Sequence, residues 1–214
     1  MNGHIDLDLT EAHLHEFDLS DCQVRTVRFD RTTFTGYAWF HKAEFTGYAW
    51  FADAKFTGDA WFGGAKFARN AWFHNAEFAG TVLFDGAEFA GGPDFLGAKF
   101  GGHAGFDDAK FAGAAVFAHA KFAGAAVFRG AKFAGAAEFR SAEFAGAAEF
   151  RSAKFTGSTE FDGAHVAPSS HTVILPIGWT TRPAAEGEEE GWLYMVRDED
   201  SSEQPTEAPG DGPA

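Results

Sequence analysis

The chain has 214 residues, of which 26 are phenylalanine and 26 are glycine, with a single cysteine and a formal net charge of −14. This length is sufficient for one domain and a tail. The sequence contains no run of about 18 apolar residues, so a membrane-spanning helix is not expected. The acidic start of the chain lacks the basic and then apolar pattern of a secretory signal. One cysteine excludes an internal disulfide framework and favours a reducing, cytoplasmic location.

The negative charge is concentrated at the two ends of the chain. Residues 1–28 carry six acids and two bases, residues 29–161 carry fourteen acids and thirteen bases, and residues 162–214 carry eleven acids and two bases. The long middle segment is therefore almost neutral. No part is basic enough to attract nucleic acid by releasing counterions, so direct nucleic-acid binding is not expected.

A five-residue spacing of apolar residues begins after a lead-in that we place at residues 1–6. The apolar centres are Leu9, Leu14, Leu19, Val24 and Phe29, and the residues two before them are Leu7, Ala12, Phe17, Cys22 and Val27. Side chains that point inward, outward and inward again are the pattern of a β-strand. Cys22 occupies one of the inward positions, so it is predicted to be a buried thiol in the core.

From Phe29 to Phe161, a phenylalanine recurs twenty-five times at spacings that alternate between five and six residues. The residue two before each Phe is nearly always Ala, and the residue between them varies. A helix of about 3.6 residues per turn cannot keep these rings on one stripe, and a Gly every eleven residues would destabilise a helix by about 1 kcal/mol per site. The pattern instead predicts a repeat of short strands with glycine at the corners.

Residues 12–16 (AHLHE), residues 17–21 (FDLSD) and the Phe-centred units after them resemble the pentapeptide repeat family, whose unit is A-(D/N)-(L/F)-x-x. The resemblance implies an all-β fold, a right-handed, four-sided parallel β-helix, over residues 7–167. Alternating spacings of five and six give about 22 residues per four-sided coil. An eleven-residue coil is the other option, but its interior could hardly hold two Phe rings per layer. We therefore expect 22-residue coils and four ladders of stacked Phe rings about 4.8 Å apart.

An open solenoid end exposes strand edges and needs a cap. Residues 168–197 are predicted to supply a C-terminal cap that resembles a β-hairpin, with Trp179 and Trp192 packed near the last coil. The segments that read as strands are His171–Leu175 and Trp192–Val196, and those that read as turns or loop are Pro176–Gly178, Pro183 and Glu186–Gly191. The composition of residues 198–214 predicts a disordered acidic tail.

Catalytic and metal-binding patterns are not recognisable in this sequence. The nine His residues are predicted to be exposed turn residues, and no cluster of His, Cys or Asp has the spacing of metal ligands. Nucleophile, phosphate-loop and dinucleotide patterns are missing as well, since the glycines follow the corner spacing. We therefore expect no catalytic, metal-binding or cofactor-binding residue, and the chain is predicted not to be an enzyme.

With 22 residues per coil, aromatic side chains align on the outside of two opposite faces. The candidate partner-binding residues are Trp39 and Trp61 on one face, Trp50 and Trp72 on the other, and the nearby Tyr37 and Tyr48. Exposed aromatic patches are typical of surfaces that contact other proteins. The other interpretation is that these side chains only stabilise neighbouring strands by cross-strand pairing.

A regular lattice without catalytic residues favours a scaffold or protein–protein interaction module. Its flat β faces would contact an unidentified protein, as a monomer or an end-to-end dimer and with no role at a membrane. The resemblance implies an alternative, namely a protein that mimics duplex DNA and binds type II topoisomerases such as DNA gyrase, which protects them from quinolones or peptide toxins. That mimicry requires a dense acidic band, whereas residues 29–161 are almost neutral. An antifreeze-like rod is a third class, but it would favour flat Thr arrays.

Overall fold

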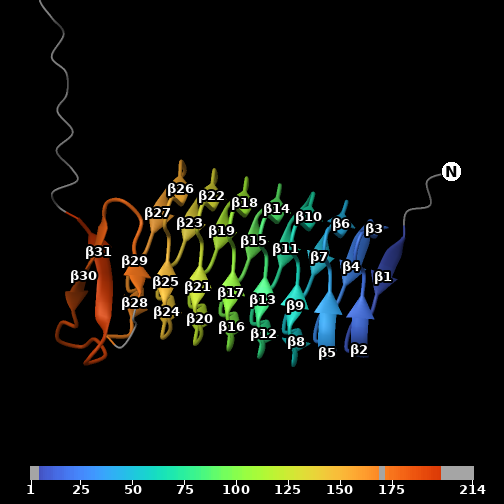
Figure 1. The fold of residues 1–214 in the computed structure, drawn as a ribbon, viewed down its shortest axis with the longest axis horizontal. Coiled ribbons are helices and arrows are strands. Elements are labelled where there is room, and N and C mark those ends of the chain that lie inside the picture. Colours follow the sequence, from blue (N-terminus) through green and yellow to red (C-terminus); the bar gives the residue numbers. More distant parts are fainter. Residues whose placement is uncertain (1–4, 169–171, 199–214) are drawn as a thin grey trace, which may run out of the picture.

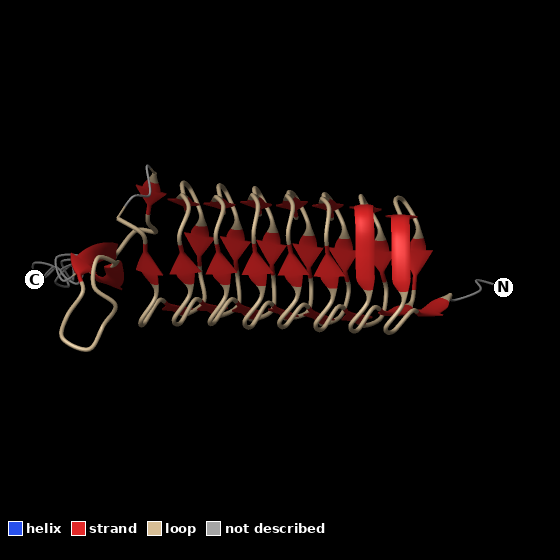
Figure 2. Ribbon diagram, turned by 90° about the horizontal axis from the view of Figure 1, so that it is seen from below, coloured by secondary structure: helices blue, strands red, loops and turns tan. Residues whose placement is uncertain are grey.

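The computed structural model describes residues 5–168 and 172–198, and within these ranges every regular element is a β-strand. Short strands follow one another around a rod, and successive coils stack along its long axis (Figure 1 and Figure 2). All pairs within the stack are parallel, and the strands form sheets of 8, 7 and 16 members. The predicted all-β parallel solenoid is confirmed.

Four faces surround the core, and each is named here after one outward residue. The Trp50 face consists of β1 (Asp6–Asp8), β4 (Thr26–Arg28), β7 (Ala49–Trp50), β11 (Ala71–Trp72), β15 (Pro93–Asp94), β19 (Ala115–Val116), β23 (Ala137–Glu138) and β27 (Thr159–Glu160). The Glu44 face consists of β3 (Gln23–Val24), β6 (Glu44–Phe45), β10 (Lys66–Phe67), β14 (Glu88–Phe89), β18 (Lys110–Phe111), β22 (Lys132–Phe133) and β26 (Lys154–Phe155).

The third sheet covers the other two faces because β5 (Thr33–Trp39) runs around a corner and pairs with β8 (Lys55–Phe56) on one face and β9 (Ala60–Trp61) on the next. The Trp39 face consists of β2 (His13–Asp18), β5, β9 (Ala60–Trp61), β13 (Val82–Leu83), β17 (Ala104–Gly105), β21 (Ala126–Val127), β25 (Ala148–Glu149) and β29 (Val173–Ile174). The Lys55 face consists of β8 (Lys55–Phe56), β12 (Glu77–Phe78), β16 (Lys99–Phe100), β20 (Lys121–Phe122), β24 (Glu143–Phe144) and β28 (His165–Val166).

The length of each coil follows from the register between paired strands. Leu14 pairs with Phe34, twenty residues later, in the first coil. From Val27, which pairs with Ala49, the offset is 22 residues. The 22-residue coil is therefore confirmed, and it begins where the spacing of five gives way to alternating five and six.

The corners are of two alternating kinds. After Phe40 the chain makes a tight turn, in which the Ala43 N–H donates to the Phe40 carbonyl at 3.0 Å and Lys42 has a φ of 53°. A positive φ at the third residue is the mark of a type II turn. After Phe45 the corner is one residue longer and contains Gly47. Tight corners lead from the Trp39 face to the Glu44 face and from the Trp50 face to the Lys55 face. Long corners lead from the Glu44 face to the Trp50 face and from the Lys55 face to the Trp39 face.

Stacked phenylalanine rings fill the interior. The four ladders begin at Phe29, Phe34, Phe40 and Phe45, and ring centroids within a ladder lie 4.5–5.3 Å apart. The ladders of opposite faces meet edge to face, as Phe40 does with Phe51 at 5.6 Å and 86°. The predicted Phe ladders are thus present. Full burial of one such side chain contributes about 1.5–3 kcal/mol, and Ala38 and Ala60 beside the rings are completely buried.

Cys22 is exposed, so the predicted buried thiol is wrong. The residue holds the expected place two before Val24, but β3 is the edge strand of the Glu44 face. Among residues 5–168 and 172–198, no strand of that sheet precedes β3 and covers it. The equivalent residue of the next coil, Ala43, is completely buried.

The C-terminal cap is a β-hairpin that contains the predicted strand at Trp192–Val196, but the other predicted strand is not part of it. Val173–Ile174 (β29) continues the solenoid by pairing in parallel with β25. The hairpin consists of β30 (Trp179–Pro183) and β31 (Leu193–Arg197), and β31 pairs antiparallel with β28 of the last coil. Pro183 thus ends a strand instead of forming a turn. A proline is tolerated there because β30 is an edge strand.

The two expected tryptophan contacts are present in this cap. Trp179 meets Phe161 edge to face at 4.9 Å, and Trp192 meets His165 at 4.8 Å. The end of the Phe29 ladder is thereby covered. His171, from the first predicted strand, lies outside the described residues, as does the predicted disordered tail beyond Asp198.

Candidate functional site

Two indole rings and a phenol ring form a group on the Trp39 face. At the end of β5 and in β9, an alanine points inward and the tryptophan after it points outward, which aligns Trp39 with Trp61 in the next coil. Their rings stack at 5.8 Å and 21°. Tyr37, at the preceding long corner, lies 5.5 Å from Trp39 and 5.1 Å from Trp61.

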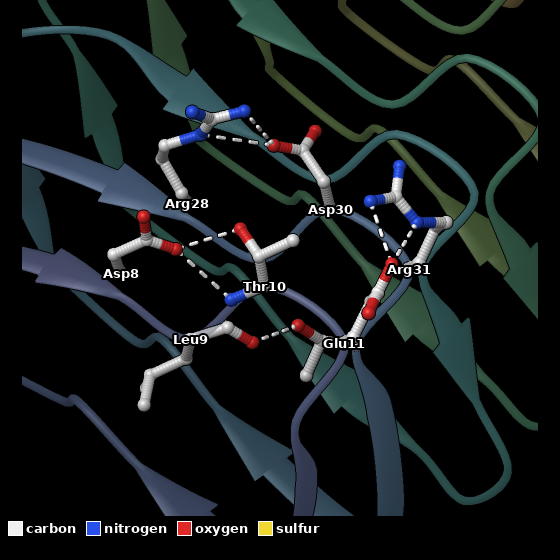
Figure 3. A network of polar contacts seen from close by, with 8 residues as sticks. Asp8, Leu9, Thr10, Glu11, Arg28, Asp30 and Arg31 are labelled. Carbon is white, nitrogen blue, oxygen red and sulfur yellow. Dashed lines mark hydrogen bonds and ion pairs between the residues drawn. The ribbon is translucent and has the colours of Figure 1, made fainter.

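The Trp50 face carries an equivalent group. Trp50 and Trp72 stack at 5.1 Å, and Tyr48 lies 5.5 Å from Trp50 and 5.4 Å from Trp72. One coil earlier, the Arg28 guanidinium lies over the Trp50 ring at 5.6 Å. Arg28 also donates to the Asp30 carboxylate at 3.0 and 3.2 Å (Figure 3).

The structure therefore brings the six predicted residues together as two groups of three on opposite faces. Tyr37 and Tyr48 are 45% and 44% exposed, and the four tryptophans are half-buried. The stacked parts of the rings stabilise neighbouring coils, as aromatic pairs across strands do. The exposed parts leave an aromatic surface that a partner can contact.

A shallow hollow with a volume of about 430 Å³ runs along the Trp39 face. Its lining consists of Ser20, Trp39, His41, Trp61, Gly63, Leu83 and Asp85. Gly63 contributes no side chain between His41 and Asp85, which keeps the hollow open. The Asp85 carboxylate accepts a hydrogen bond from the Asp107 N–H at 3.1 Å. Burial nevertheless raises the pKa of Asp85 above its ordinary value.

Sequence comparison places this architecture in a family. A family model described as pentapeptide repeats (9 copies) matches residues 40–88, 73–121 and 117–165. The chain belongs to the pentapeptide repeat family. Comparison with curated proteins gave no match.

Among solved structures, this pentapeptide repeat protein is similar to HetL, which is described as a pentapeptide repeat protein involved in heterocyst differentiation regulation from the cyanobacterium Nostoc sp. strain PCC 7120. The two chains are 17% identical, and the match covers 74% of this chain and 87% of HetL with a TM-score of 0.28.

On each of the other two faces of this pentapeptide repeat protein, lysine and glutamate side chains of successive coils form ion pairs. On the Glu44 face, Lys66 pairs with Glu44 at 2.9 Å and Lys110 pairs with Glu88 at 2.7 Å. The Lys66 ammonium, together with Gln23, holds the pKa of Glu44 below its usual range. On the Lys55 face, Lys99–Glu77 and Lys121–Glu143 pairs span 2.8 Å each. Such exposed pairs contribute little stability, but each glutamate in them is neutralised by a lysine of an adjacent coil.

Within residues 5–168 and 172–198, no group of three or more His, Cys, Asp or Glu could hold a metal ion. The same part of the chain contains no helix with the length and apolarity needed to cross a membrane.

A second hollow, of about 600 Å³, lies at the first coils and is lined by Asp21, Cys22, Gln23, Lys42, Glu44, Gly64 and Lys66. Its mixed charges give no catalytic arrangement.

Sequence reasoning missed four residues beside the aromatic groups, namely Asp18, Arg28, His41 and Asp85. A signal for two of them was present. Arg28 directly precedes the core residue Phe29, as Trp50 precedes Phe51, and Asp18 directly precedes Leu19, as Trp39 precedes Phe40. The hollow beside His41 and Asp85 depends on side-chain volumes in four coils, which the repeat pattern alone does not give.

Proposed function

We propose that this pentapeptide repeat protein is a non-enzymatic interaction module or scaffold of the cytoplasm, and that its two aromatic groups bind a protein partner. The observation that supports this proposal is the grouping of six partly exposed aromatic side chains on the first coils of two opposite faces. Aromatic residues dominate the binding energy of many protein interfaces. The equivalent outward positions of later coils hold Glu138, Glu149 and Glu160, which are ordinary solvent-facing residues.

The charge pattern favours this role over mimicry of duplex DNA. A mimic needs an acidic band that follows the rod, whereas lysine and glutamate of successive coils pair on the Glu44 and Lys55 faces. The proposed partner is therefore a protein that contacts the aromatic faces, with neither nucleic acid nor membrane in contact. One copy, or two copies stacked end to end, would leave both faces free.

Affinity capture from lysate of the native host, followed by mass spectrometry, tests this role. The double variant Trp39→Ser plus Trp61→Ser should lose a partner that the wild-type protein captures. The double variant Trp50→Ser plus Trp72→Ser reports on the opposite face, and Glu138→Ser plus Glu149→Ser is the matched control on later coils. Thermal unfolding should show that each variant remains folded.

Capture that survives both tryptophan double variants would disprove the proposed surface. A supercoiling assay with purified gyrase provides the complementary check. Inhibition or protection of gyrase at micromolar protein would replace the proposal with DNA mimicry.

A further inference from the structure

The two aromatic groups differ in the residue that lies one coil before them. Arg28 pairs in register with Trp50, whereas Asp18 pairs in register with Trp39. Two residues further on, Asp30 holds the arginine on one face, and Ser20 occupies the corresponding position on the other. The same place beside an outward indole thus carries a cation on the Trp50 face and an anion on the Trp39 face.

On the Trp50 face, the chain supplies its own cation to the aromatic group. Arg28 lies over Trp50 and is held by Asp30, with Asp8 of the preceding coil on its other side (Figure 3). The cap repeats the arrangement, because Arg197 lies 4.3 Å over Trp179 and Arg182 lies 5.5 Å over Tyr194. A guanidinium over an aromatic face gains from the quadrupole of the ring.

On the Trp39 face, this partner is missing among the described residues. No Lys or Arg of residues 5–168 and 172–198 lies over the Trp39 or Trp61 ring. The Asp18 carboxylate accepts a hydrogen bond from the Ser20 N–H at 2.8 Å, and neither Asp18 nor Asp85 forms an ion pair with a described residue. The hollow is therefore lined by two indoles and by Asp85, and Asp18 lies next to Trp39 in the preceding coil.

The nearest basic side chains leave the hollow without a Lys or Arg in its lining. Lys42 follows His41 in the chain, but it turns the corner and lines the separate hollow on the Glu44 face. His41 lines the hollow itself, and His103 lies near Asp85 on the long-corner side. Arg129 is already paired with Asp107 at 3.2 Å. The first four coils of the Trp39 face are thus left aromatic and acidic.

We propose that this hollow binds an extended basic segment of a protein partner, with an arginine side chain over Trp39 beside Asp18 and a second basic side chain near Asp85. The arginine of the partner places a guanidinium over Trp39, as Arg28 of this chain places one over Trp50. Asp18 and Asp85 lie three coils apart, which is about 14 Å at about 4.8 Å per coil. An extended peptide covers this distance in about four residues at about 3.3 Å each. The inference rests on the proposed interaction function and specifies its partner.

A short peptide tests the inference directly. The probe is acetyl-Arg-Gly-Ser-Gly-Arg-amide, and the control is the same peptide with both arginines replaced by citrulline, which keeps the shape and removes the charge. Binding is followed by NMR through the indole N–H signals of the six tryptophans. The Trp39 and Trp61 signals should shift in a saturable way with the arginine peptide, and the citrulline peptide should bind at least about tenfold more weakly.

The decisive variant is Asp18→Arg, which places a cation of the chain where Arg28 stands on the other face. Asp18 is exposed, so the variant should fold, and it should bind the probe at least about tenfold more weakly because the site is already filled. Asp85→Asn should weaken binding by about threefold or more. Trp72→Leu, on the opposite face, is the control and should bind the probe as the wild type does.

Equal binding of the arginine and citrulline peptides would overturn the inference, as would undiminished binding by Asp18→Arg. Should Asp18→Arg fail to fold, undiminished binding by both Asp85→Asn and Trp39→Leu would overturn it. Capture of a partner separates this inference from the proposed function. A partner that is lost with Trp39→Ser plus Trp61→Ser but retained with Asp18→Arg would leave the interaction face in place and remove the basic segment.

Discussion

Gly58 lies directly against Gly36 of the preceding coil, so closely that a Cβ on Gly58 would stand only 2.2 Å from the Gly36 carbonyl oxygen. The contact is repeated along the rod, with Gly124 on Gly102 at 2.3 Å and Gly146 on Gly124 at 2.3 Å. Real Cβ atoms do not approach oxygen this closely. This long-corner position recurs every eleven residues from Gly36 to Gly157 and is glycine in every coil except at Arg69, and close packing between coils accounts for the preference.

Gly124→Ala should destabilise the protein substantially. The added methyl group would meet the Gly102 backbone at 2.3 Å, and backbone cannot move aside as a flexible side chain does. Overpacking of this kind costs about 1–3 kcal/mol. The midpoint of urea unfolding should fall accordingly.

The matched control for this substitution is a glycine at a tight corner. Gly86 has a φ of 65°, but no atom lies within 4 Å of the place where its Cβ would be. Lys42 and Asp108 occupy the same corner in other coils with φ values of 53° and 54°. Gly86→Asn should therefore change stability by less than about 1 kcal/mol. An equal loss in both variants would show that conformation, and not contact, explains the glycines.

Ala126→Leu should destabilise the protein more than Val127→Leu. Ala126 is completely buried beside the Phe ladders, where a larger side chain costs about 1–3 kcal/mol. Val127 points outward and is 8% exposed, but the paired Gly105 has no side chain, so a leucine can extend over Gly105 and should cost about 1 kcal/mol or less. Thermal melting of the two variants gives the ranking, and the reverse order would contradict the inward and outward assignment.

The core could be predicted from the sequence because it repeats. Phe at alternating spacings of five and six and Ala two residues before it determine which side chains point inward, and the ladders follow from stacking equal coils. For Gly58, the sequence predicted the position but not the reason that glycine is needed there. Its spacing marks a corner, but the need for glycine arises from contact with Gly36, which depends on the distance between coils.

The ends and the aromatic site were harder to predict because they depart from the repeat. Cys22 follows the inward pattern and is nonetheless exposed, since burial also requires a neighbouring coil. Val173 and Trp179 both have strand-forming character, and only tertiary contacts decide that the first extends the solenoid and the second forms the hairpin. The six aromatic residues were found from the period alone, whereas Asp18 lies in the shorter first coil and Arg28 lies where the 22-residue offset begins.

Cys22 should react rapidly with a thiol reagent under native conditions, because its side chain is exposed at the first coil. The matched comparison is Ala65→Cys in a Cys22→Ala background, which places a thiol on the same face at a position that is completely buried. That thiol should react at least about a hundredfold more slowly, since the reagent reaches it only after local opening. Similar labelling rates would contradict the exposed position of Cys22.

Acid should loosen the C-terminal cap through Glu188. Arg182 donates two hydrogen bonds of 2.6 Å to the Glu188 carboxylate, and this contact, with the Ala185 N–H, lowers the pKa of Glu188 from 4.5 to about 2. A carboxyl whose pKa is lower in the folded state stabilises that state above its unfolded pKa. The contribution should therefore be complete above about pH 4.5 and disappear as the pH falls toward about 2.

Near-UV circular dichroism of the cap tryptophans measures this loosening, and Glu188→Gln is the variant that isolates it. Glu44, Glu77 and Glu88 also have lowered pKa values, so the wild type and the variant share an acid response from the solenoid. Only the difference between their pH profiles reports on Glu188. We expect Glu188→Gln to have a less stable cap at pH 7 and to approach the wild type as the pH falls from about 4.5 toward about 2. A constant difference over this range would show that the Arg182–Glu188 pair does not hold the cap.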